Sequence, residues 1–303
     1  MKLLKYILIT IILIFSKTVA QESQINQAIY LFTITGDSIS GIQLKGALGL
    51  SVDLSGAIYI SDTENNRILK FNSDGKLIKS VGGFGWEKEQ FYTPHDICAG
   101  SALDVFVADY NNHRIQRYDK DLNYIFSLYS DENWEEAFQF AYPKSVAVSI
   151  HGDLFIIDGE NTRLLKLNSF GEPEMSFGDF SEGKGRLIDP VQITMSPKDR
   201  MYVSDGGVNK IVVFDYFGNY LSEIGRGFLK EPQGLFYSSL NLLFVADTGN
   251  KRVVIFHPEG DLIFQWSIIS DELGKFQNPV DVVTFGKMVF VLDENKVFVF
   301  ELK

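Results

Sequence analysis

The segment Asp109-Tyr110-Asn111-Asn112-His113-Arg114-Ile115 carries the fold prediction, because it recurs along the chain. Close copies occupy residues 62–68 and 158–164, and looser copies begin at Asp205, Asp247 and Asp293. The leading aspartates of consecutive copies are 42 to 49 residues apart, so one unit is repeated six times. Repetition at this period is typical of proteins built from stacked supersecondary units.

Each unit has the same internal order of strand and turn signals. A short apolar strand such as residues 57–61 ends at the aspartate, and an alternating strand such as residues 68–71 follows the turn. A hairpin signal, as in Ser73-Asp74-Gly75, leads to a further alternating strand. An apolar residue, two spacers and a proline then open the next unit, as in residues 91–94. Four short strands per repeat predict the blade of a β-propeller.

The repeats predict an all-β fold: a six-bladed β-propeller of four-stranded antiparallel blades, formed by residues 21–303. The last unit lacks its fourth strand, whereas residues 28–34 form an orphan strand before the first unit. We expect this N-terminal strand to complete the last blade and close the ring, which leaves no free sheet edge between the two strands.

Residues 1–20 have the pattern of a signal peptide. Lys2 and Lys5 precede a short apolar run, and Thr18-Val19-Ala20 provides small residues for cleavage. A signal anchor is the alternative. We expect a secreted or periplasmic protein with no membrane span in the mature chain and no cysteine for lipidation at the cleavage point. The single cysteine, Cys98, forms no intrachain disulfide, and no Asn-x-Ser/Thr sequon occurs, which favours a bacterial envelope.

The composition excludes several classes of protein. Hydrophobic residues make up 45% and charged residues 22% of the chain, as in globular proteins rather than disordered ones. The formal charge is −11, and removal of residues 1–20 makes it −14, because three lysines leave with no acid. Binding to nucleic acid needs a basic surface, so we expect no nucleic-acid partner.

The repeated Asp-x-x-Asn-x-Arg-Ile pattern resembles the NHL repeat, and Asn112-His113-Arg114 comes nearest to its consensus. The resemblance covers residues 28–303 and implies a propeller, but it is unspecific for function. NHL-like propellers serve as binding modules in tripartite-motif proteins, as sensor domains of bacterial kinases and as a lyase in peptide amidation. We expect a monomeric module that binds a protein, peptide or carbohydrate through one face. The alternative is a metal-dependent hydrolase or lyase with its site at the central channel.

The aspartate and arginine of each repeat are interpreted as a structural clasp. A catalytic pair would not recur in every blade. We expect the aspartate to cap the amides of its turn and the arginine to bind carboxylate and carbonyl oxygens.

The residue after each repeat's proline is expected at the mouth of the channel. The resemblance implies zinc-binding histidines there in the lyase-like relatives, but a catalytic zinc needs about three protein ligands. In this chain His95 stands alone, because the equivalent positions hold Leu48, Lys144, Val191, Gln233 and Val280. His95, Lys144 and Gln233 are therefore candidate residues for ligand binding.

The next position holds Asp96 and Asp281, with Gly49, Ser145, Gln192 and Gly234 in the other blades. Two carboxylates among amide and hydroxyl oxygens can hold a hard cation such as Ca²⁺. The alternative is that they bond inner-strand amides or water, and we expect no bound cofactor.

Two interblade loops are the other candidate binding sites. One contains Trp86-Glu87 and the other Trp134-Glu135, so each places a tryptophan among acidic residues. Such loops can stack a sugar ring or hold a cationic peptide. The alternative is that the tryptophans pack over the adjacent blade.

Overall fold

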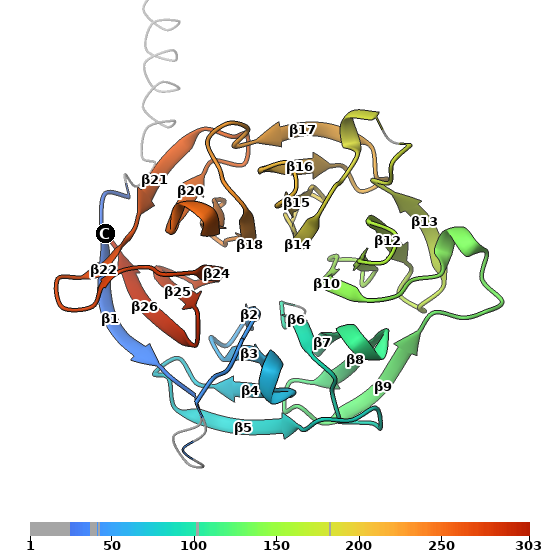
Figure 1. Ribbon diagram of the computed structural model, residues 1–303, viewed down its shortest axis with the longest axis horizontal. Helices are drawn as coiled ribbons and strands as arrows, with labels where there is room; N and C mark the ends of the chain where they lie inside the picture. The colour runs from blue at the N-terminus through green and yellow to red at the C-terminus, as the bar shows by residue number, and fades with distance from the viewer. Residues whose placement is uncertain (1–24, 37–40, 42, 101–102, 182) are drawn as a thin grey trace, which may run out of the picture.

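The computed structural model describes residues 25–36, 41, 43–100, 103–181 and 183–303. Within them, six four-stranded antiparallel sheets are arranged in a ring around a central axis (Figure 1). This architecture confirms the all-β six-bladed propeller predicted from the repeats. The predicted signal peptide, residues 1–20, lies outside the described residues.

The first three blades are formed from consecutive strands, which follow one another from the channel outward. Blade 1 contains β2 (Gly49–Val52), β3 (Ile58–Asp62), β4 (Arg67–Phe71) and β5 (Leu77–Gly82). Blade 2 contains β6 (Pro94–Cys98), β7 (Asp104–Asp109), β8 (Arg114–Asp119) and β9 (Tyr124–Tyr129). Blade 3 contains β10 (Pro143–Val148), β11 (Leu154–Asp158), β12 (Arg163–Leu167) and β13 (Pro173–Phe177).

The remaining blades follow the same order, except for the last outer strand. Blade 4 contains β14 (Pro190–Met195), β15 (Met201–Asp205), β16 (Lys210–Phe214) and β17 (Tyr220–Ile224). Blade 5 contains β18 (Pro232–Tyr237), β19 (Leu243–Asp247), β20 (Arg252–Phe256) and β21 (Leu262–Trp266). Blade 6 contains β24 (Pro279–Phe285), β25 (Met288–Asp293), β26 (Lys296–Leu302) and β1 (Ala28–Ile34).

Short elements connect the blades and their strands. A two-stranded hairpin, β22 (Ile268–Ser270) with β23 (Gly274–Lys275), joins blades 5 and 6. Single 3₁₀ turns occur at η1 (Thr63–Asn65), η2 (Tyr110–Asn112), η3 (Glu136–Phe138), η4 (Gly183–Gly185) and η5 (Thr248–Asn250).

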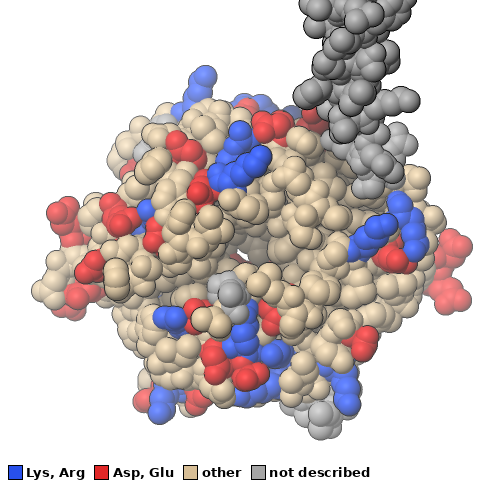
Figure 2. All heavy atoms as spheres, turned by 180° about the vertical axis from the view of Figure 1, so that it is seen from behind, with Lys and Arg blue, Asp and Glu red and all other residues tan. Residues whose placement is uncertain are grey.

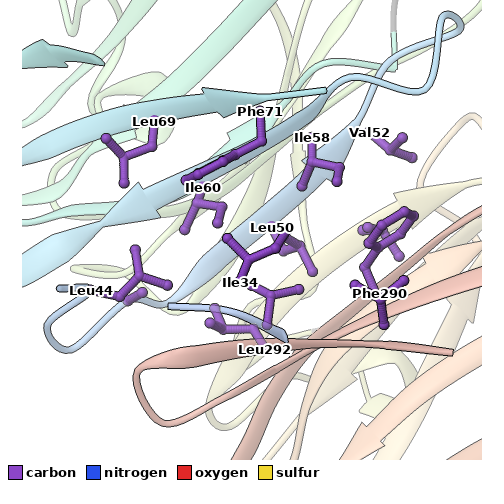
Figure 3. Close-up of a cluster of buried hydrophobic side chains, with 14 of the residues drawn as sticks. Ile34, Leu44, Leu50, Val52, Ile58, Ile60, Leu69, Phe71, Phe290 and Leu292 are labelled. Carbon is purple, nitrogen blue, oxygen red and sulfur yellow. The ribbon is translucent and has the colours of Figure 1, made fainter. Parts of the chain in front are cut away.

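The N-terminal strand closes the ring as predicted. β1 pairs antiparallel with β26 from Ala28 opposite Leu302 to Ile34 opposite Val297. Ile34 is buried in the hydrophobic cluster between blades 6 and 1, which Figure 3 shows together with Leu50 and Phe290. Because residues from both ends of the chain share this core, its packing joins the first and last blades.

The repeated aspartate fastens each blade to the loop before it. In all six blades its carboxylate accepts a hydrogen bond from a backbone amide 15 to 17 residues earlier, as in Tyr92 N to Asp109 Oδ1 at 2.8 Å. Arg114 Nε donates to Asp109 Oδ2 at 2.8 Å, and both side chains are buried. The expected clasp is therefore present.

The clasp differs in one detail from the sequence-based expectation. In blades 1, 2 and 5 the side chain of the aspartate does not cap its own 3₁₀ turn. One carboxylate oxygen accepts from the preceding loop, and the other accepts from the arginine and an asparagine of the same repeat. In blade 4 the arginine is replaced by Lys210, which pairs with Glu223 at 2.7 Å.

Candidate functional site

The inner strands begin at one mouth of the channel, which we call the proline mouth. In blades 2 to 6 the register shifts directly after the proline, so the following residue has no partner on the second strand. Such a bulge redirects side chains. A cavity of about 230 Å³ lies there, and it is lined by Leu48, His95, Asp96, Lys144, Asp189, Val191, Gln192, Gln233, Gly234 and Val280. Of the five candidate residues at the two channel positions, the cavity thus brings together His95, Asp96, Lys144 and Gln233, whereas Asp281 is not part of its lining.

His95 is held flat against a neighbouring aromatic ring at this mouth. Its imidazole stacks on Tyr110 with a centroid distance of 3.9 Å and an interplanar angle of 3°. Burial, together with the positive charge of Lys144, lowers the pKa of His95 to about 4. Lys144 in turn donates to Asp189 at 2.5 Å. At neutral pH the mouth therefore presents a neutral imidazole beside an ion pair.

The second channel position forms a ring of hydrogen bonds between neighbouring blades. Asp96 accepts from the backbone amide of Val146 at 3.1 Å, and Asp281 accepts from that of Leu50 at 2.7 Å. Ser145 and Gln192 accept from the next blades in the same way. Each side chain thus binds the inner-strand amide of the following blade, and together they hold the blades around the channel.

Glycine occupies this position in the two blades that precede the aspartates. A Cβ on Gly234 would lie 2.3 Å from the Asp281 Cα atom, and one on Gly49 would lie 2.8 Å from the Asp96 Cα atom. The close approach therefore leaves no room for a side chain. Gly234 has no side chain to bind the inner-strand amide of blade 6, Val282 N. This amide donates to Asp281 at 2.7 Å.

Gln192 joins the two aspartates across the channel. Its Nε2 donates to Asp96 Oδ1 at 3.3 Å and to Asp281 Oδ2 at 3.2 Å. Burial raises the pKa of both carboxyl groups, and that of Asp281 is raised further by the negative charge of Asp96. In the described part of the chain, no three His, Cys, Asp or Glu side chains are grouped so that they could hold a metal ion.

The proline face, defined as the face around the proline mouth, carries an aromatic strip over blade 2. Phe84, Trp86 and Tyr92 are 61%, 67% and 40% exposed, and Phe84 contacts the other two rings edge-on at 6.1 and 5.1 Å. Towards the channel the strip continues through half-buried rings, whose contacts link His95, Tyr110, Tyr142 and His113. The two parts adjoin, because Asn111 N donates to Tyr92 O at 3.1 Å.

The two predicted tryptophan loops differ in their packing. Trp86 is exposed, as is Glu87 beside it. Trp134 is half-buried and packs against the hydrophobic cluster between blades 2 and 3, while Glu135 is exposed. The structure therefore presents Trp86 on the surface, whereas Trp134 serves largely to cover the adjacent blades.

Sequence reasoning missed most of the aromatic strip. Tyr92 and Tyr142 each lie just before a blade's opening proline, and Tyr110 and His113 lie in the repeat's turn. Tyr110 and His113 replace the Thr63 and Asn66 of the first repeat, and this change from polar to aromatic residues could have indicated the strip. The turn and the loop before it meet in every blade, which brings these rings together.

Comparison with known proteins supports the assignment of the repeats. The family model for the NHL repeat matches residues 91–118 in blade 2 and 229–256 in blade 5. Protein brain tumor of Drosophila melanogaster is 32% identical over 146 residues, which cover 48% of this chain and 13% of that protein. NHL repeat-containing protein 3 of Homo sapiens is 28% identical over 198 residues, which cover 63% and 55%. The chain thus spans about half the length of the human relative and a much smaller part of the Drosophila protein.

A solved structure supports the fold. The streptogramin B lyase structure aligns with 91% of this chain and 97% of its own at a TM-score of 0.62 and 13% sequence identity. At this identity the likeness concerns the fold alone. No helix in the described residues is long and apolar enough to cross a membrane. The six closed blades, the repeated clasp and the family matches together show that the chain is an NHL-repeat six-bladed β-propeller.

Proposed function

We propose that this propeller is a binding module whose proline face takes a protein or peptide partner with apolar and basic side chains. The exposed group Phe84, Trp86 and Tyr92 carries the proposal, because three large rings gather on one face of the blade. Aromatic side chains that are rigid and exposed are typical anchors of protein interfaces. The neighbouring mouth, with His95, Lys144 and Gln233, extends the same surface.

The loop that carries Trp86 is fixed before any partner arrives. The guanidinium group of Arg114 donates to the carbonyl oxygens of Trp86, Glu87 and Gln90 at 2.8 to 2.9 Å. Asn112 Nδ2 donates to Gly85 O at 2.9 Å. A loop held in this way loses little conformational entropy on binding, which favours affinity.

The shape and charge of the surface favour a peptide over a carbohydrate. Phe84 stands at 82° to Trp86 and 79° to Tyr92, so the rings form a ridged surface rather than one flat platform for a sugar ring. Glu87, Lys88 and Glu89 are exposed on the same loop, which leaves it one net negative charge, and the whole chain carries a charge of −11. Basic side chains of a partner would be attracted to this face.

A peptide array tests this proposal and its alternatives. Immobilised short peptides, either basic-aliphatic or acidic-aliphatic, and neutral oligosaccharides would be probed with the wild type, with Trp86→Ala and with Phe170→Ala. Phe170 is 88% exposed in the β12–β13 turn, so it controls for the loss of an exposed ring. We expect the wild type and Phe170→Ala to bind the basic-aliphatic peptides, and Trp86→Ala not to bind them. Preference for the oligosaccharides or the acidic peptides would contradict the proposal.

We further propose that the protein acts outside the cytoplasm. The proposal rests on the signal-peptide pattern of residues 1–20. N-terminal sequencing of the protein recovered from an expressing bacterium would test it. We expect the chain to begin at Gln21, whereas an N-terminus at Met1 would contradict export with cleavage.

The metal-dependent enzyme is the weaker candidate, because its carboxylates already have partners. Asp96 accepts from Ser145, Val146 and Gln192, and Asp281 accepts from Leu50, Val282 and Gln192. A cation there would have to displace donors that link the blades. Stoichiometric Ca²⁺ or Zn²⁺ in the purified protein, lost in Asp96→Ala, would support the enzyme.

A further inference from the structure

The ring of Asp96, Gln192 and Asp281 divides the channel into two hollows. Asp96 and Gln192 line the cavity at the proline mouth and also a second cavity, of about 430 Å³, where the inner strands end. We call this second opening the far mouth. Its volume lies within the range of about 300 to 1,000 Å³ that is usual for small-molecule sites.

The cavity at the far mouth has largely apolar walls, and none of the described residues that line it is basic. All six inner strands contribute, with side chains that include Leu50, Ile97, Val146, Met195, Phe236 and Val283. Among its described lining residues the acids are Asp53 and Asp96. Asp53 accepts hydrogen bonds from Ser55, Ala57 and Tyr59, so it is already satisfied. The lining thus offers no counter-charge for an anionic ligand.

Three exposed apolar side chains lie at the rim of the far mouth. Leu54, Ile150 and Phe285 line the cavity and are 74%, 69% and 38% exposed. Figure 2 shows this face, with a central hollow surrounded mainly by uncharged residues and with most charged side chains further out. Exposed apolar side chains around a concave opening are characteristic of a binding site.

We propose that the far mouth binds an uncharged, largely apolar small molecule. Its apolar body lies between the ends of the inner strands. Gln192 and Asp96 form a polar floor beneath it. This site is on the face opposite the aromatic strip and does not depend on the proposed partner binding.

Titration with Nile red, a neutral apolar dye with a carbonyl group, tests the proposal. We expect saturable one-to-one binding to the wild type. Met195→Trp would fill the cavity and abolish binding, whereas Leu262→Trp, on the exposed outer strand β21, would leave it unchanged. Trp86→Ala would leave dye binding intact.

Two results would overturn the proposal: no saturable binding, or binding that survives in Met195→Trp. Thermal unfolding of each variant shows whether it is folded. If Met195→Trp does not fold, amide chemical shifts of the wild type decide the matter. Dye-induced shifts should concentrate at the ends of β2, β6, β10, β14, β18 and β24, and shifts elsewhere would refute the site.

Discussion

At the scale of single residues, the ring around the channel depends on where side chains are absent as much as where they are present. Asp281 accepts from Leu50 N of blade 1 on one side, and on the other side the missing side chain of Gly234 lets the inner strand of blade 5 approach it. Elsewhere in the ring, Ser145 and Gln192 bind the next blade directly. At this ring position, glycine occurs where the next inner strand comes too close for a side chain, and polar residues occur in the other blades.

Gly234→Ala should destabilise the fold. The new Cβ would lie 2.3 Å from the Asp281 Cα atom, so the backbone would have to move, at a cost of about 1–3 kcal/mol. Gly206→Ala is the matched control, because its Cβ would have no neighbour closer than 3.7 Å. Urea unfolding of both variants measures the difference. Equal stability of the two would show that the inner strands are not packed this closely.

His95 should make the stability depend on pH. Its pKa of about 4 in the folded protein lies below the ordinary 6.5, so the unfolded chain binds more protons between these values. Its contribution is present above about pH 6.5 and is lost as the pH falls towards 4. His95→Phe should remove this dependence in urea titrations at several pH values. A constant difference between wild type and variant over that range would contradict a buried neutral imidazole.

At the scale of elements, the strand β1 determines whether the ring is closed. It forms the outer edge of blade 6 and contributes Ile34 to the core shared with blade 1. The blades on either side of the closure are therefore joined by side-chain packing as well as by strand pairing. Figure 1 shows β1 beside β26, although the two lie at opposite ends of the described chain.

Ile34→Asp should destabilise the whole propeller by about 3 kcal/mol or more, because it would bury an unpaired carboxylate. Leu31→Asp on the same strand is the control, since Leu31 is 43% exposed, and we expect about 0.5 kcal/mol. Thermal unfolding followed by circular dichroism measures both. Similar melting temperatures for the two variants would show that β1 does not contribute to the closed core.

At the scale of the whole molecule, the repeats predicted the blades but not which side chains meet between them. The aspartate spacing and the orphan strand at residues 28–34 sufficed for the six blades and their closure. Apart from Val282, the partners named for Asp96 and Asp281 lie on other blades, up to 231 residues away in sequence, so their pairing required the structure. The exposure of Trp86 and the packing of Trp134 likewise depend on tertiary contacts.

The whole molecule offers two faces of different chemistry. The proline face carries exposed aromatic rings and acidic loops, whereas the far mouth is apolar and its described lining contains no basic residue. The ring of Asp96, Gln192 and Asp281 separates the two hollows. A rigid closed ring with distinct faces suits a module that presents surfaces to partners rather than one that changes shape.

The most direct test of the account is the affinity of a basic-aliphatic peptide, taken from the array, for the wild type, Trp86→Ala and Phe170→Ala by isothermal titration calorimetry. If Trp86 is the anchor, its truncation should cost about 2 kcal/mol or more, which is about thirtyfold in Kd. Phe170→Ala should bind like the wild type. Unchanged affinity in Trp86→Ala, or a loss confined to Phe170→Ala, would contradict the assignment of the proline face as the binding surface.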